Sequence, residues 1–351
     1  SASSVYQDPF TLARSLASLD HLSGGRIGWN ILTSFYKDTA RKTYTTGRAF
    51  SYEDRYAISQ DFMNASLALW QAWDENAIVR DKDSGYYAIP ERVHPVSHKG
   101  PYFQLEGALN VSRSPQQVPV LFVPVSSPDG QEFAATNGEV VFNRQNNLAD
   151  MKLFYRAIKE KAKQHGRDPE SVLVTPGVIL VVGDTVEEAE AQFQRIVPFI
   201  DPARALGQIE ALFGWAPGLV SPASLPVDWP RIEKPSNYTE ALVDQAKKNG
   251  LSLQQLAIRA SASRGFLLLV GTAESVADTL QHWYESEAVD GFVVGPIVAP
   301  DGVKDITRKL VPELQRRGLF RKHAGKGETL REALGLPDHR QASHTREDDA
   351  A

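Results

Sequence analysis

The sequence contains no cysteine and only two methionines. Without cysteine there is no disulfide framework, thiolate metal site or catalytic thiol. No apolar run approaches the roughly 18 residues of a membrane-spanning helix, and residues 1–10 lack the basic start and apolar stretch of a signal peptide. The 38 Lys and Arg nearly balance the 43 Asp and Glu, so no basic surface for nucleic acid or anionic membranes is indicated. We therefore expect a protein of a reducing, cytoplasmic compartment.

What is present indicates an α/β protein. The 351 residues are 42% hydrophobic and 23% charged, a balance typical of a globular protein with a core. Nearly continuous apolar segments alternate with helical patterns, as in parallel sheets that are covered on both faces. The segments are residues 27–32, 118–125, 139–143, 172–182 and 291–295. Five strands suit an open doubly wound sheet and are too few for an eight-stranded barrel, and the pattern alone does not separate these folds.

Two long regions interrupt the alternation. Residues 80–110 are rich in Gly, Pro, His and Tyr and predict an irregular excursion with short strands. Residues 198–235 are rich in Pro, Gly and Trp and predict a loop with at most short helices. The polar residues 341–351 predict a disordered tail.

Small hydroxyl residues follow two of the predicted strands. Thr33 and Ser34 follow the first, and Ser126 and Ser127 follow the second, directly before Pro128. Ligand sites in α/β folds form at the carboxyl ends of the strands, and the free N–H groups of a helix start favour an anion. These residues therefore predict either a phosphate cradle or an ordinary serine cap followed by proline, and the local sequence favours the cap.

Familiar catalytic motifs are absent from the sequence. It contains no G-x-G-x-x-G, no G-x-x-x-x-G-K-[ST] and no G-x-S-x-G. His94 and His98 are four residues apart, but Pro95 and Gly100 deny them a helix, so loop histidines are favoured over a metal pair. No metal is expected, and no catalytic residue is assigned.

Longer strings are more specific than any of these motifs. They include DPFTLAR at 8–14, ASLDHLSGGR at 17–26, GWNILTS at 28–34, RSPQ at 113–116 and VPELQRRG at 311–318. These strings closely resemble the bacterial luciferase-like flavin monooxygenases. The subgroup is that of nitrilotriacetate monooxygenase, dibenzothiophene-sulfone monooxygenase and pristinamycin synthase. The resemblance covers residues 5–337.

The resemblance implies a (β/α)₈ barrel with long insertions, here near 80–110 and 198–250, in a single domain over residues 1–340. It implies that reduced FMN binds at the carboxyl ends of the strands and reacts with O₂ to give a flavin C4a-hydroperoxide, which oxygenates a small organic substrate. A separate NAD(P)H-dependent flavin reductase would supply the reduced FMN, and a homodimer is expected. A flavin cofactor carries out the oxygen chemistry itself, so the absence of a catalytic motif from the sequence is expected. The substrate is not indicated.

The resemblance also implies flavin-binding positions on and before the long helix of residues 51–73. Tyr56 matches the family's tyrosine, whereas Tyr52 stands where the family has histidine. A tyrosine still donates a hydrogen bond but is not a cation near neutral pH. Asn30 matches the family's strand end, and Ser1 corresponds to the end of a flavin-contacting Thr/Ser string.

The family's phosphate loop falls on residues 123–127. Ser126, Ser127 and the following Gly130 are the implied cofactor-binding residues. Val125 replaces a glycine of the family, and it follows Pro124. Glycine permits a close approach of the backbone to a phosphate. Whether the family's usual phosphate contacts form with valine at this position therefore has to be tested.

In the family, Asp8-Pro9 follows the third barrel strand. Residues 1–5 are therefore expected to be the stump of that strand, and about three βα units, roughly 90 residues, are expected before it. These missing units, Tyr52 and Val125 favour an alternative, a catalytically silent relative that serves as a structural or interaction module, or a gene fragment. A flavin- or F420-binding dehydrogenase on the same barrel is a weaker alternative, because the matching strings belong to the monooxygenase subgroup.

Overall fold

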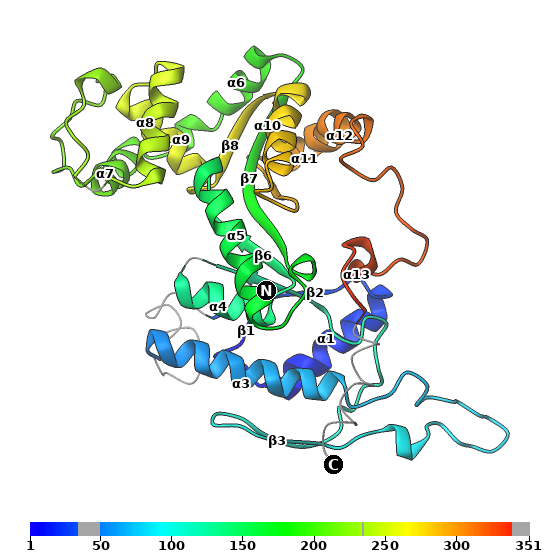
Figure 1. The fold of residues 1–351 in the computed structure, drawn as a ribbon. Coiled ribbons are helices and arrows are strands. Elements are labelled where there is room, and N and C mark those ends of the chain that lie inside the picture. Colours follow the sequence, from blue (N-terminus) through cyan, green and yellow to red (C-terminus); the bar gives the residue numbers. More distant parts are fainter. Residues whose placement is uncertain (34–49, 126, 234, 339–351) are drawn as a thin grey trace. The chain divides into compact units, whose positions relative to one another are not determined.

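The computed structural model describes residues 1–33, 50–125, 127–233 and 235–338 (Figure 1). The chain divides into two compact units. Unit 1 comprises residues 1–141, 161–172 and the chain from residue 323 onward, and unit 2 comprises residues 142–160 and 173–322. Two elements, β6 (Val140–Asn143) and α5 (Leu148–Gln164), have residues in both.

The other elements of unit 1 are β1 (Ala2–Ser3), α1 (Pro9–Ser23), β2 (Gly28–Leu32), α3 (Tyr52–Trp70), the 3-10 turn Pro90–Arg92, β3 (Val96–Lys99), β4 (Gln104–Gly107), β5 (Val120–Pro124), α4 (Pro128–Asn137), the 3-10 turn Pro169–Ser171 and α13 (Leu330–Ala333). Strand β1 lies within the segment predicted as a strand at residues 1–5, and α3 confirms the predicted helix of residues 51–73.

Strands β1, β2 and β5 form a parallel sheet in unit 1. Asn30 of β2 lies opposite Phe122 of β5 in the register. Side chains alternate between the two faces of a strand, so Trp29 and Ile31 are buried while Asn30 and Leu32 are half-buried on the other face. The polar residue of the GWNIL string therefore lies on the face opposite the buried aromatic core.

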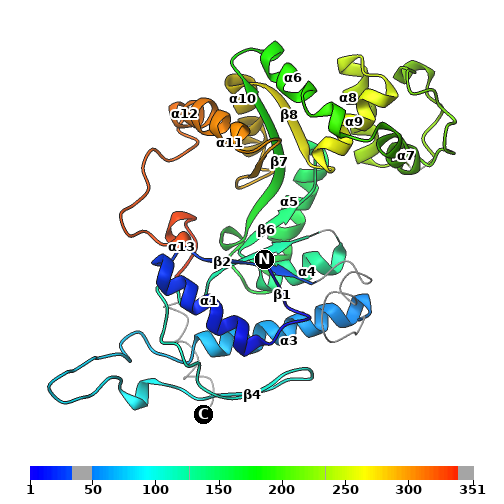
Figure 2. The same ribbon diagram turned by 180° about the vertical axis from the view of Figure 1, so that it is seen from behind.

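Helices α1 and α3 lie side by side in both views and pack on the Trp29 core (Figures 1 and 2). The ring of Trp29 lies 5.8 Å from that of Phe62 and 6.2 Å from that of Trp70. The indole N–H of Trp70 donates to the carbonyl oxygen of Ala13 at 3.0 Å. Burial of each large ring contributes about 2 kcal/mol, and the hydrogen bond fixes how the two helices meet.

The β3–β4 hairpin is held to α3 by one buried carboxylate, Asp61. Its Oδ2 accepts hydrogen bonds from the backbone N–H groups of Tyr102 (2.8 Å) and Phe103 (2.9 Å), and its Oδ1 lies 2.8 Å from Nε2 of His98. A Cβ atom on Gly100 would lie 1.8 Å from Oδ1 of Asp61. Only glycine therefore lets this turn close onto the carboxylate.

The C-terminal part of unit 1 is fastened to its centre by a buried ion pair between Arg331 of α13 and Glu139, which precedes β6. Both side chains are less than a tenth exposed. Nη2 of Arg331 donates to Oε2 of Glu139 at 3.0 Å and to the carbonyl oxygen of Val118 at 3.1 Å, and Nη1 donates to that of Pro337 at 3.0 Å. Oε2 of Glu139 also accepts from the N–H of Leu121 at 3.0 Å. Arg331, which lies in the C-terminal part of the resemblance, therefore anchors this part of unit 1.

The elements that lie wholly within unit 2 are β7 (Leu173–Gly183), α6 (Val186–Gln194), the 3-10 turn Val197–Phe199, α7 (Pro202–Phe213), the 3-10 turn Pro226–Asp228, α8 (Asn237–Asn249), α9 (Leu253–Ser263), β8 (Leu267–Thr272), α10 (Ala273–Glu285), β9 (Val293–Pro296), α11 (Asp301–Asp305), the π-helical turn Ile306–Leu310 and α12 (Val311–Arg316).

Strand β7 is the centre of the unit 2 sheet, and β8 and β9 both pair with it in parallel. Val178 of β7 lies opposite Leu267 of β8 and opposite Val294 of β9. Alternate residues of β7 from Val178 onward pack against α10 and the π-helical turn around Leu310. Helices α7, α8 and α9 enclose a second apolar cluster centred on the fully buried Phe213.

The structure confirms the five predicted strands within one or two residues at each end, and it corrects two further expectations. The apolar run before Gly271, which the five predicted strands do not include, is β8. The expectation that residues 198–235 hold at most short helices is wrong, because α7 has 12 residues. Asp201 caps α7 and Pro202 occupies its first turn, where proline needs no N–H partner, so proline here begins a helix instead of ending one.

None of the helices in the described part of the chain is both long and apolar enough to cross a bilayer. The predicted tail at 341–351 lies outside the described residues.

Candidate flavin site

Ser127 lies beyond the carboxyl end of β5 and caps helix α4. Its Oγ accepts a hydrogen bond from the N–H of Gly130 at 3.1 Å, and Pro128 occupies the first turn. The ordinary serine cap, which the local sequence favoured, is therefore confirmed. A cap hydroxyl keeps its own proton, so it can still donate to an anion at this helix start.

Tyr56 of α3 brings a second hydroxyl to the same place. Its Oη lies 3.3 Å from Oγ of Ser127, and its ring lies 5.9 Å from that of Phe133 on α4. The structure thus brings together two predicted site residues that are 71 positions apart in the sequence. Sequence spacing alone could not indicate this contact, although the resemblance implies that both residues bind the cofactor.

Gly130 makes this approach possible because it has no side chain. A Cβ atom at this position would lie 3.0 Å from Oη of Tyr56 and 3.1 Å from Oγ of Ser127. These distances are tighter than ordinary contacts, so any larger residue would push the hydroxyls away from the helix start. Three predicted site residues therefore form one cluster, the hydroxyl cradle, made of Tyr56, Ser127 and Gly130.

Val125, which replaces a glycine of the family, is turned into the core beside this cradle. It is 5% exposed, and its Cγ1 would lie 3.7 Å from a Cβ atom on Gly130. The side chains of two further predicted site residues are outside the described part of the structure. Ser126 lies outside the described residues, and Tyr52 is the first residue of α3 but its side chain is outside the described part.

Asn30 and Ser1 form a second polar group on the unit 1 sheet. Nδ2 of Asn30 donates to Oγ of Ser1 at 2.9 Å. Ser3 lies opposite Leu32, so β1 and β2 end at one edge of the sheet, and Asn30 stands two residues, roughly 7 Å, before that edge. This pair therefore lies on the sheet face, and the hydroxyl cradle lies beyond the strand ends.

An open hollow of about 350 Å³ adjoins Tyr56 along α4. Two acidic residues, Asp129 and Glu132, line it. Hydrogen bonds from Lys161 and then His165 hold the pKa of the Glu132 carboxyl below its ordinary value, so this group is ionised at neutral pH. Because two carboxylates face this hollow, it is unfavourable for an anion.

His94 and His98 do not share a ligand. Nε2 of His94 lies 3.0 Å from Oδ1 of Asp74, whereas His98 contacts Asp61. Across the described ranges, no three or more His, Asp or Glu side chains are grouped so that they could hold a metal ion. Both histidines act in the structure as partners of loop and helix carboxylates.

Residues 1–291 match the model of the family described as luciferase-like monooxygenase. The chain belongs to the luciferase-like monooxygenase family. It is 36% identical over 342 residues to N-acetyl-S-(2-succino)cysteine monooxygenase of Bacillus subtilis (strain 168), covering 95% of this chain and 76% of that protein. It is 37% identical over 337 residues to nitrilotriacetate monooxygenase component A of Aminobacter aminovorans, covering 95% and 74%.

The family is also evident in solved structures. A riboflavin lyase, crystallised with modified FMN and its substrate riboflavin, is 31% identical, with a TM-score of 0.77 over 96% of this chain and 74% of that one. The expected fold class, a luciferase-like α/β barrel type, is confirmed. The chain is a flavin-dependent monooxygenase of this family, and the alternative of a silent relative is not favoured.

Proposed function

We propose that unit 1 binds FMN with the phosphate at the hydroxyl cradle and the flavin ring toward Asn30 and Ser1. Gly130 is the observation that carries this proposal, because its missing side chain leaves the two hydroxyls of Tyr56 and Ser127 together at a helix start. Hydroxyl donors and the positive end of a helix are the groups that bind phosphate in proteins.

The residues present fit a phosphate without a basic side chain. The hydroxyls of Tyr56 and Ser127 lie 3.3 Å apart, so one of them donates to the other, and a bound anion would accept hydrogen bonds from the pair in place of that contact. Pro128 has no N–H, and the N–H of Gly130 is already bonded to Ser127, so the two hydroxyls carry most of the recognition. Val125 is buried beside the cradle.

Bound reduced flavin supplies the electrons that activate O₂, and the protein's own residues bind and orient it. We propose that a separate NAD(P)H-dependent reductase delivers reduced FMN, that the substrate is a small organic molecule, and that the protein works in the cytoplasm. We further propose that both units are parts of one luciferase-like domain and that the chain forms a homodimer. The substrates for which the relatives are named range from nitrilotriacetate to long-chain alkanes, so they do not select one compound.

The test is an anaerobic titration of the protein with reduced FMN, in which binding is monitored by tryptophan fluorescence. The wild-type chain should bind saturably, and Gly130→Ala should bind 10- to 100-fold more weakly, because a lost hydrogen bond to a charged group costs about 1.5–3 kcal/mol. Gly207→Ala is the matched control: Gly207 is also helical, and a Cβ atom there meets nothing within 4 Å. It should bind like wild type.

Riboflavin, which lacks the phosphate, separates a phosphate site from a general loss of folding. Gly130→Ala should bind reduced riboflavin as tightly as the wild type does. Equal weakening of both flavins would contradict the assignment of the phosphate to the cradle. No saturable binding of reduced FMN by the folded wild-type chain would contradict the proposed flavin site itself.

A further inference from the structure

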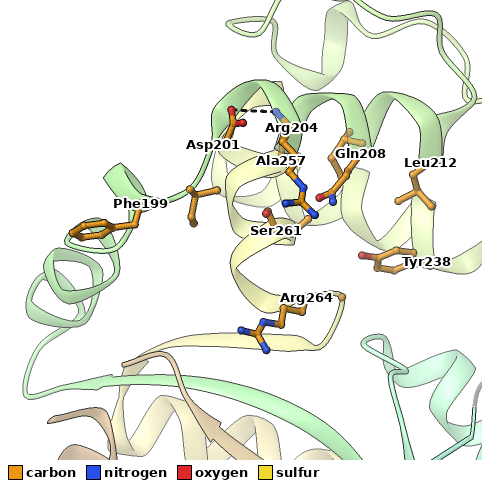
Figure 3. A pocket seen from close by; sticks show the side chains of 13 residues that line it. Phe199, Asp201, Arg204, Gln208, Leu212, Tyr238, Ala257, Ser261 and Arg264 are labelled. Atoms are coloured by element: carbon orange, nitrogen blue, oxygen red, sulfur yellow. Dashed lines mark hydrogen bonds between the residues drawn. The ribbon is translucent and has the colours of Figure 1, made fainter. Parts of the chain in front are cut away.

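Unit 2 contains a second cavity, between helices α7 and α9 (Figure 3). Its volume is about 570 Å³, within the range of small-molecule sites. Arg204, Gln208 and Leu212 are spaced four residues apart, so they project from one face of α7. The α9 wall consists of small residues such as Ala257 and Ser261, which leave the space open.

Two guanidinium groups face this cavity, those of Arg204 and Arg264. In the described parts of the chain, no carboxylate forms an ion pair with either of them. The carboxylate of Asp201 is engaged as the cap of α7, where it accepts hydrogen bonds from the N–H groups of Ala203 (3.0 Å) and Arg204 (3.3 Å). The cavity therefore presents two exposed guanidinium groups and one carboxylate, that of Asp201, to a ligand.

Neutral polar groups and apolar walls complete the cavity. Burial raises the pKa of Tyr238, so its hydroxyl stays protonated and can donate. Gln208 and Ser261 add side-chain donors near Arg204 (Figure 3). Ile209 and Leu212 form an apolar wall on α7. This combination suits a molecule with one anionic end and an apolar body.

The backbone of Arg264 gives an independent reason to assign its side chain a role. Arg264 is the C-cap of α9 with a φ of 54°, a left-handed conformation in which glycine is usual. A non-glycine residue pays conformational strain there, and Gly265 stands next to it with a φ of 82°. Helix capping alone would favour glycine at 264.

None of the predicted flavin-binding residues lines the cavity. All the predicted flavin-binding residues belong to unit 1, and the cavity lies wholly in unit 2.

We propose that this cavity binds a small organic anion, a carboxylate, sulfonate or phosphate ester with an apolar body, held by Arg204 and Arg264. A bound anion would be shared by the two guanidinium groups, which match the oxygens of such groups in planar geometry.

The test is calorimetric titration of the flavin-free protein with benzoate, benzenesulfonate and phenyl phosphate, and with neutral benzamide as the uncharged probe. At least one anion should bind saturably and at least tenfold more tightly than benzamide, and comparison of the three identifies the preferred oxyanion. Because no flavin is present, the result does not depend on the proposed flavin site. Equal binding of benzamide, or no saturable binding of any anion, would overturn the proposal.

Variants separate recognition from folding. Arg204→Gln and Arg264→Gln should each weaken anion binding about tenfold, and the exposed Arg308→Gln, outside the cavity, should not change it. Arg264→Gly is the decisive variant, because it relieves the left-handed strain while removing the guanidinium. Its melting temperature should equal or exceed that of wild type while anion binding is lost. Retained binding in Arg264→Gly would contradict the proposal.

Discussion

The buried ion pair between Arg331 and Glu139 offers a stringent test of how unit 1 is held together. Replacing Arg331 with Met keeps the length of the side chain and removes its charge. Glu139 then loses its hydrogen bonds to the guanidinium group and keeps that from the N–H of Leu121, and the carbonyl oxygens of Val118 and Pro337 lose the donors that Arg331 supplied. An ionised carboxylate would remain in a site where it is about 6% exposed.

The magnitude follows from that burial. Removing one partner of a buried pair typically costs about 3–5 kcal/mol, because the other charge stays buried and unpaired. A loss of about 3 kcal/mol accelerates amide exchange through the same opening by about 150-fold. An exposed pair such as Lys304 with Asp301, with side chains 53% and 69% exposed, contributes at most about 1 kcal/mol. Lys304→Met is therefore the control.

Hydrogen–deuterium exchange with mass spectrometry is the appropriate assay, because it reports unit 1 separately. Peptides covering residues 116–141 and 325–338 should exchange at least 100-fold faster in Arg331→Met than in wild type, and those covering 176–183 of unit 2 should change least. The double variant Arg331→Met/Glu139→Gln should lose at least 1 kcal/mol less than the sum of the two single variants. Additive losses, or an effect no larger than that of Lys304→Met, would refute the reasoning.

Three other predictions follow from single contacts. Hydrogen bonds from Arg316 and then Arg317 lower the pKa of Glu313 to about 2, so the contribution of Glu313 to stability is complete above about pH 4.5 and is lost as the pH falls toward 2. The difference in unfolding free energy between wild type and Glu313→Gln, measured by urea unfolding, should therefore shrink between about pH 4.5 and about pH 2. A difference that stays constant over this range would contradict the prediction. Asp61→Asn should weaken the β3–β4 turn by about 1–3 kcal/mol, measured as faster exchange of the two amides that Asp61 binds, and unchanged protection would argue against the anchor. Phe213→Ala should cost about 3–5 kcal/mol in thermal unfolding of unit 2, because the ring is fully buried, and a loss below 1 kcal/mol would show that the α7–α9 cluster is dispensable.

The strands were predictable because their apolar runs are long, whereas the elements of the second insertion were not. Residues 172–182 are almost entirely apolar, and they form the central strand β7. Helix α7 was not predicted because Pro202 and Gly207 are residue types that often break helices, although proline in a first turn and glycine on an exposed helix face are both tolerated. Local composition could not reveal the core around Phe213 that stabilises this helix.

The candidate site was predictable only in part. The local sequence around Ser127 correctly indicated a helix cap. It could not indicate that Tyr56 reaches this cap, because the contact joins residues far apart in the chain, and the family resemblance implied only that both residues bind the cofactor. The cavity between α7 and α9 had no sequence signal, since Arg204 and Arg264 become neighbours only through the packing of two helices.

The anchoring of Arg331 also bears on the order in which the chain can fold during synthesis. Glu139 is synthesised 192 residues before Arg331. The ion pair between them therefore cannot form until the chain has been translated as far as Arg331. Unit 2 lies almost wholly between these two positions and can complete its core first. The first residues of unit 1 are synthesised before unit 2, but unit 1 completes its core after unit 2. Chaperone binding to nascent chains should therefore concentrate on residues of unit 1.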